Sequence, residues 1–245
     1  MSHWQRTLFD LGDQVGLHPL GTDLHRRFLG PTAWVDFRYG WVQRHDLLFE
    51  DLLDGVPWAL ERRPMYDRTV EVPRLVASYG AEDRLPHPVL ADAWRRIDER
   101  YATPTSGPLR SVGACLYRDG GDSVAWHGDR IGRQDVTDTV VAIVSLGQRR
   151  RLLMRPVAGG GPSLRFDLGA GDLLVMGGHC QQLWEHCVPK TARPLGPRIS
   201  VQFRTGGASA REPAPPTGSV PERSAGWHPG PCDRIHRTGS IGPDP

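Results

Sequence analysis

The stretch Arg198-Ile-Ser-Val-Gln-Phe-Arg204 alternates strictly between polar and apolar residues. This period of two predicts a β-strand whose polar side chains share one face, while Ile199, Val201 and Phe203 share the other. If the strand lines a closed barrel, its two guanidiniums can each hold one carboxylate of a dicarboxylic co-substrate. An ordinary amphipathic strand with its arginines in water is the alternative that the alternation alone leaves open.

Seven more short strands are expected between residue 111 and this stretch, separated by glycines at 120–121, 159–161, 169–171 and 177–178. They are Val112–Tyr117, Ser123–Trp126, Thr139–Leu146, Arg151–Pro156, Leu164–Leu168, Asp172–Met176 and Gln181–Cys187. Eight short strands fit a jelly roll, the double-stranded β-helix of cupin-like proteins. The sequence therefore predicts a mainly β (α+β) fold.

The N-terminal half adds one strand and two helices. Residues 34–39 are expected to form the strand, and residues 45–54 a helix that Gly55 ends. A second helix is expected after Pro88, because apolar residues recur at helical spacing as far as Tyr101. Both helices should pack against a sheet. The segment between them, residues 62–80, is rich in β-formers, arginine and aromatics and is interpreted as a lid or loop.

A candidate metal site lies at the end of the run Ser123-Val-Ala-Trp-His-Gly-Asp129. Residues two apart on a strand point to the same side, so His127 and Asp129 can face one centre. With His186 they provide two imidazoles and a carboxylate, the ligand set of a non-haem Fe(II) oxygenase that leaves positions open for a chelating co-substrate and O2. A His-x-Asp pair alone is more often a surface turn or a hydrogen-bonded pair.

Two neighbouring residues give rival ligand sets. Cys187 could suggest zinc, but adjacent strand residues face opposite sides, so Cys187 and His186 should not share an ion. His179 is the substitute ligand if His186 is wrong, although its position in a turn favours a solvated histidine.

Several stretches occur in an order and spacing that resemble the AlkB-like Fe(II)/2-oxoglutarate dioxygenases, over about Pro73 to Thr205. They are Leu116-Tyr117, Trp126-His-Gly-Asp129, Val144-Ser-Leu-Gly147, Gly171-Asp-Leu-Leu-Val-Met-Gly-Gly178, Trp184-Glu-His186, and Arg198 with Arg204. The resemblance implies that His127, Asp129 and His186 bind iron. It also implies that Arg198 with Tyr117 holds the distal carboxylate of 2-oxoglutarate, and that Arg204 lies near the carboxylate that chelates iron.

The chain departs from the family pattern at three positions. Cys115 stands where the family usually carries an asparagine that helps to hold the co-substrate, and Ser200 replaces another polar helper on the last strand. Both changes should weaken co-substrate binding modestly. Ile131 stands where repair members often carry an acidic residue that contacts the base, so base preference cannot be carried over.

The segment Val72–Gly80 is similar to the family's nucleotide-recognition lid. The aromatics Tyr79, Tyr66 and Trp58 are candidates to stack a flipped base against His127, although a lid aromatic is more often part of the core. Local phosphate contacts could come from basic residues in and after the lid, which otherwise are solvated strand edges. These residues are Arg62, Arg63, Arg68, Arg74 and the run 149–151.

The expected organisation of the 245 residues is an N-terminal extension at 1–35, a dioxygenase domain at 36–205, and a disordered Pro/Gly-rich tail at 206–245. Within the domain, the lid spans about 56–85 and the jelly-roll core about 111–205. The four cysteines form no CxxC pair, and no stretch resembles a membrane span or a signal peptide. We therefore expect a cytoplasmic monomer with reduced thiols.

The function implied by the resemblance is oxidative dealkylation of alkylated nucleobases, as in DNA alkylation repair, with Fe(II), 2-oxoglutarate and O2. A formal net charge of +2 is too small for broad attraction to nucleic acid, so binding would need a local patch. One alternative is the same chemistry on modified RNA, a protein or a small metabolite. An alternative of another class is a nucleic-acid-binding or metal-binding jelly roll without turnover.

Overall fold

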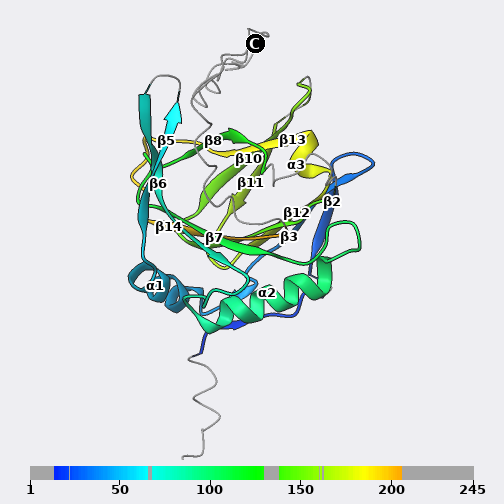
Figure 1. The fold of residues 1–245 in the computed structure, drawn as a ribbon, viewed down its shortest axis with the longest axis horizontal. Coiled ribbons are helices and arrows are strands. Elements are labelled where there is room, and N and C mark those ends of the chain that lie inside the picture. The colour runs from blue at the N-terminus through cyan, green and yellow to red at the C-terminus, as the bar shows by residue number, and fades with distance from the viewer. Residues whose placement is uncertain are drawn as a thin grey trace, which may run out of the picture.

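Two antiparallel sheets face each other in the computed structural model, which describes residues 14–21, 23–65, 68–129, 138–159, 161 and 163–205 (Figure 1). The major sheet has the strand order β2 (His25–Phe28), β3 (Ala33–Arg38), β12 (Leu173–Gly178), β9 (Val141–Gly147), β14 (Arg198–Arg204), β7 (Ser111–Tyr117), β6 (Arg68–Gly80) and β5 (Ala59–Met65). The minor sheet has the order β11 (Leu164–Leu168), β10 (Arg150–Pro156), β13 (Trp184–Val188) and β8 (Val124–His127). This arrangement is the predicted jelly roll.

The strand β14 is central in the major sheet, because it pairs over its whole length with both β7 and β9. Its apolar residues Ile199, Val201 and Phe203 belong to the core beneath the helices. The arginines at its two ends therefore point to the opposite face, into the space between the sheets. The predicted alternation of this strand is confirmed.

Three helices and a small two-stranded sheet complete the described chain. The helices are α1 (His45–Gly55), α2 (Pro88–Tyr101) and α3 (Cys180–Leu183), and β1 (Gly16–Leu17) pairs with β4 (Val42–Gln43). Figure 1 shows α1 and α2 across the outer face of the major sheet. The start of α2 follows from its sequence. The His87 side chain caps the helix by accepting a hydrogen bond from the Val89 amide, and Pro88, at the first helical position, has no amide hydrogen that would need an acceptor. None of the described helices has the length and apolarity that crossing a bilayer requires.

Two core clusters result from this layering. One lies between the helices and the major sheet and includes Leu48, Leu90 and Ile97. The other lies between the two sheets and includes Met154 and Met176. The second cluster shares its space with the polar face of β14, so the site is built into the interior of the roll.

The structure corrects two sequence expectations. The strand expected at 181–187 begins only at Trp184, because the amides of Gln182 and Leu183 bond to the carbonyl of His179 and close a short helical turn, α3. The lid is a β-hairpin: β5 pairs with β6, which continues the major sheet beside β7. The tail predicted to be disordered, residues 206–245, lies outside the described residues, as do Tyr66 and Ile131.

An ion pair between the exposed Arg26 and the buried Asp36 lies at the sheet edge, and Asp36 also connects it to α2. Asp36 accepts two hydrogen bonds from Arg26, at 2.7 and 2.9 Å, and a third from the hydroxyl of Tyr101 at 3.0 Å. Burial and the neighbouring Asp36 carboxylate raise the pKa of Tyr101, so the phenol stays protonated and keeps donating. The carboxylate thereby receives three hydrogen bonds from protein donors.

We expect Tyr101→Phe to reduce the free energy of unfolding by about 2 kcal/mol, because a buried carboxylate loses a hydrogen-bond donor. Urea denaturation followed by circular dichroism measures the change. Tyr39→Phe is the matched control, since the Tyr39 side chain is 68% exposed, and its effect should stay within about 0.5 kcal/mol. Equal effects of the two substitutions would contradict the bonding assigned to Asp36.

Candidate active site

The side chains of His127, Asp129 and His186 form a cluster whose ligand atoms all lie within 4.8 Å of one another. His127 ends β8, and His186 lies directly opposite it on β13. Their ring centroids are 4.3 Å apart. Asp129 follows two residues later, where the chain leaves the sheet. The three residues that the sequence singled out are thus brought together, and no other group of three such side chains meets this criterion in the described part of the chain.

Hydrogen bonds hold two members of the cluster in place. His127 Nδ1 lies 2.9 Å from the carbonyl of Ala125, and a proton donated there leaves Nε2 with a free lone pair, 3.5 Å from Asp129. The Asp129 amide donates to Oε1 of the buried Gln181 at 2.9 Å. Only glycine fits at position 128, between these two residues, because a Cβ there would lie 2.5 Å from the Gln181 carbonyl oxygen.

The electrostatics suit a divalent cation. Burial would raise the pKa of Asp129, but the Arg204 guanidinium, 3.4 Å away, and the two imidazoles hold it well below its usual value. Burial, aided by His127, lowers the pKa of His186 to about 3. At neutral pH the cluster therefore offers one carboxylate and a neutral imidazole at His186, and binding a metal there requires no proton to be removed from either.

The far end of the inter-sheet space is built around Arg198 and Tyr117, which face each other across β14 and β7. The Arg198 Nε donates to Ser145 Oγ at 3.0 Å, whereas its Nη1 is buried without a hydrogen-bond partner. Its guanidinium carbon lies 5.2 Å from the centroid of the Tyr117 ring. Burial raises the pKa of Tyr117 to about 12, so its hydroxyl can donate at neutral pH. An unpartnered buried donor beside a phenol fits a carboxylate.

The layer between the two arginines contains two of the three departures from the family pattern, Cys115 and Ser200. Cys115 and Ser200 are direct cross-strand partners. Gln202 links them: it donates to Ser200 Oγ at 2.6 Å and to the Ser200 carbonyl, and its Oε1 lies 3.8 Å from Cys115 Sγ. The two unusual residues therefore share one small polar network on the face of the sheet that carries Arg198 and Arg204.

The lid residues do not lie as predicted. Tyr79 and Trp58 pack against the core on the helix side of the major sheet, because alternation along β6 sends Leu75, Ala77 and Tyr79 to that side. Base stacking against His127 does not fit this placement. Arg74 points to the opposite side, where its Nη1 lies 3.3 Å from the carbonyl of Ser123 and its Nε is buried without a partner.

The remaining predicted residues are placed as follows. Arg62 is exposed and pairs with Glu71, while the side chains of Arg63 and Arg68 lie outside the described part. His179 precedes α3 and is not a member of the metal cluster, and Cys187 is fully buried and is not a member either. The phosphate-binding role of these arginines stays a prediction.

Sequence reasoning missed the supporting roles of three residues: Gln181, Ser145 and Arg150. Arg150 was predicted within the run 149–151 to contact phosphate, whereas its guanidinium is buried and bonded to backbone carbonyls. For Arg150 a signal was present, because it precedes Leu152 and Met154 at a period of two, and both are buried between the sheets. Arg150 is accordingly buried, unlike its neighbours Arg149 and Arg151. Gln181 bonds to Asp129 and Ser145 bonds to Arg198, and in each case the two residues come from segments that are distant in the chain.

Comparisons with known proteins agree with this geometry. A family model described as the 2OG-Fe(II) oxygenase superfamily matches residues 51–204. The human alpha-ketoglutarate-dependent dioxygenase alkB homolog 3 is 33% identical over 217 residues, which cover 78% of this chain and 69% of that protein. The bovine DNA oxidative demethylase ALKBH2 is 28% identical over 178 residues, which cover 65% of this chain and 63% of that protein.

A solved structure supports the fold alone. It is a prolyl hydroxylase from Trichoplax adhaerens in complex with a hypoxia inducible factor peptide fragment, with a TM-score of 0.50 and 13% identity. The match covers 75% of this chain and 83% of that one. Together, the family model and the relatives show that the chain belongs to the 2OG-Fe(II) oxygenase superfamily and, within it, to the AlkB-like dioxygenases. It is a 2-oxoglutarate-dependent dioxygenase, and its cofactors are Fe(II), 2-oxoglutarate and O2.

We expect Gly113→Ala to impair catalysis without unfolding the protein. The new Cβ would lie 2.6 Å from Arg204 Nη1 and 3.1 Å from Gln202 Oε1, so the Arg204 guanidinium must shift, and we expect the shift to break its contact with Asp129. Losing one charged contact should lower kcat/KM for 2-oxoglutarate about tenfold, as measured by succinate formation. Gly55→Ala is the control, because open space surrounds Gly55. Unchanged kcat/KM in Gly113→Ala would reject the positioning of Arg204.

Proposed function

We propose that this protein is an oxidative demethylase of alkylated nucleobases in DNA, in which His127, Asp129 and His186 bind Fe(II). The observation that carries the proposal is the convergence of these three ligands with the buried Arg198, whose Nη1 has no hydrogen-bond partner, in one inter-sheet space. The names of relatives, DNA oxidative demethylase among them, support the substrate class.

The types of side chain in the site match the groups that Fe(II) and 2-oxoglutarate require. Two imidazoles and one carboxylate suit Fe(II) and leave positions for a bidentate co-substrate and O2. When bound, the iron and 2-oxoglutarate supply the oxidising chemistry that hydroxylates an N-methyl carbon, after which formaldehyde is released. Arg198 and Tyr117 bind the distal carboxylate of the co-substrate, and Arg204 offsets the negative charge that gathers around Asp129.

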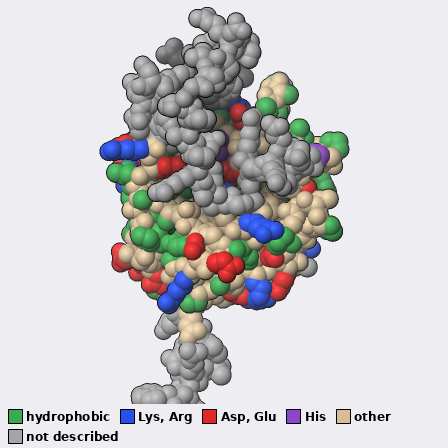
Figure 2. Space-filling model, in the orientation of Figure 1, with side chains coloured by type: hydrophobic (Ala, Val, Ile, Leu, Met, Phe, Trp, Pro, Cys, Tyr) green, Lys and Arg blue, Asp and Glu red, His purple; other side chains and the backbone are tan. Residues whose placement is uncertain are grey.

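The metal-ligand residues differ in solvent exposure, which indicates the side from which a nucleobase can approach. The His127 side chain is 36% exposed, whereas His186 is buried. The site therefore opens to solvent beside His127, and a nucleotide turned out of a duplex or a single strand can reach it there. On the described surface visible in Figure 2, acidic and basic side chains are interspersed.

Succinate formation with Fe(II), 2-oxoglutarate and O2 tests turnover, and formaldehyde release from methylated oligonucleotides tests the substrate. We expect release from methylated single-stranded DNA, and loss of it by at least about 100-fold in Asp129→Ala, because the remaining pair binds iron weakly. Release from methylated RNA alone would assign the alternative substrate. Succinate formation without release from either would favour a protein or small-molecule substrate, and no succinate at all would favour a binding protein without turnover.

His179→Ala is the matched control for His127→Ala. We expect His127→Ala to abolish formaldehyde release and His179→Ala to retain wild-type release, because only His127 belongs to the cluster. An unchanged rate in His127→Ala would reject the ligand assignment. Cytoplasmic location and a monomeric state stay predictions, which cell fractionation and analytical ultracentrifugation would check.

A further inference from the structure

Arg150 is a buried cation whose hydrogen bonds all go to neutral acceptors. It begins β10 and is only 4% exposed. Its Nη1 donates to the Asp119 carbonyl at 2.7 Å, and its Nη2 donates to the carbonyls of Asp122 at 2.8 Å and Pro189 at 2.9 Å. The nearby carboxylate of Asp122 is instead engaged by both the amide and the guanidinium of Arg118. The charge of Arg150 therefore has no carboxylate in direct contact among these bonds.

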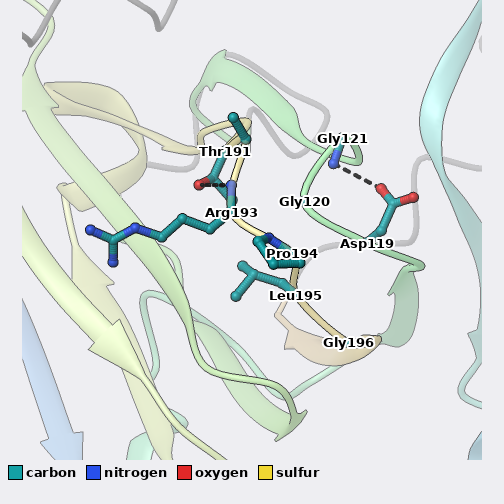
Figure 3. A pocket seen from close by; sticks show the side chains of 9 residues that line it. Asp119, Gly120, Gly121, Thr191, Arg193, Pro194, Leu195 and Gly196 are labelled. Atoms are coloured by element: carbon teal, nitrogen blue, oxygen red, sulfur yellow. Dashed lines mark hydrogen bonds between the residues drawn. The ribbon is translucent and has the colours of Figure 1, made fainter.

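The three carbonyls belong to segments that carry the active-site residues. Asp119 and Asp122 lie in the turn that joins β7, which ends at Tyr117, to β8, which ends at His127. Pro189 follows β13, which carries His186. One side chain thus links the end of β7, the start of β8 and the end of β13. The same turn and residues 191–196 line a pocket (Figure 3). The volume of this pocket is about 610 Å³. A hydrogen bond from the Thr191 amide to the Gly120 carbonyl also joins the turn to that segment.

Arg150 also contacts the co-substrate end of the site through Tyr117. Its guanidinium carbon lies 5.5 Å from the centroid of the Tyr117 ring, and that of Arg198 lies 5.2 Å from the same centroid. Two guanidiniums beside one neutral ring place two positive charges in a buried region, close enough for Arg150 to disfavour the charged form of Arg198. Such an arrangement is costly unless an anion completes it.

We propose that Arg150 is a positioning residue for the distal carboxylate of 2-oxoglutarate, fixing Tyr117 and adding a second positive charge to that end of the site. The inference rests on the proposed roles of Tyr117 and Arg198. The co-substrate carboxylate then completes a buried group of two cations and one phenol. Arg150 does not touch the metal ligands, so its effect is directed at co-substrate affinity rather than at the chemical step.

The experiment compares Arg150→Met with Arg149→Met and Arg151→Met, which remove the same charge from exposed neighbours. Calorimetry without O2 measures the Kd of Mn(II), used in place of Fe(II), and then the Kd of 2-oxoglutarate for the Mn(II)-loaded protein. We expect Arg150→Met to raise the Kd of 2-oxoglutarate at least about tenfold, since a charge is lost beside a buried carboxylate. The Kd of Mn(II), and both values in the two controls, should stay within about twofold.

Two results would overturn the inference: an unchanged Kd of 2-oxoglutarate in Arg150→Met, or equal weakening of Mn(II) and 2-oxoglutarate, which indicates a merely structural role. If Arg150→Met does not fold, Arg150→Lys takes its place, because it keeps the charge and loses the fork that binds three carbonyls. An increase of about threefold or more in its 2-oxoglutarate Kd supports the inference, and no increase rejects it. Failure of the wild-type protein to bind 2-oxoglutarate would reject the proposed function instead.

Discussion

The structure depends on one constraint, the alternation of side chains along a strand that is paired on both sides. Because β14 is bonded to β7 and β9 over all its residues, it cannot rotate or slip by one residue without exchanging its two faces. Phe203 and its apolar neighbours are held by the helices outside the sheet. Arg198 and Arg204 are consequently fixed in the space between the sheets, and the burial of the helix-side core stabilises the position of these charges.

Charged side chains lie at both ends of the space between the sheets. At one end, Arg204 and the imidazoles stabilise the ionised form of Asp129, and at the other, Arg198 and Arg150 flank the neutral ring of Tyr117. A dicarboxylic acid with a chelating end and a free end matches this polarity. The same low-dielectric surroundings that make an unpaired guanidinium costly also strengthen its attraction to a bound carboxylate.

Much of the site could be predicted from the sequence because its residues follow local rules. His127 and Asp129 are two apart at the end of a strand, and Arg198 and Arg204 keep the parity of an alternating strand, so their shared orientation follows from the period of two. The same rule explains why Tyr79 does not lie where base stacking would need it: it alternates in step with Leu75 and Ala77, which face the helices. A strand starting at 181 was also expected, whereas bonds to the His179 carbonyl form a helical turn there.

The sequence by itself determined the class of fold, the candidate ligands and the arginine pair, because strand periodicity and residue chemistry are properties of short segments. Only the tertiary structure decided that Gln181 holds the Asp129 amide, that Ser145 orients Arg198, and that Arg150 is buried against Tyr117. Those contacts join residues from 33 to 53 positions apart in the chain. Which distant segments meet depends on how the two sheets pack, and no single segment carries that information.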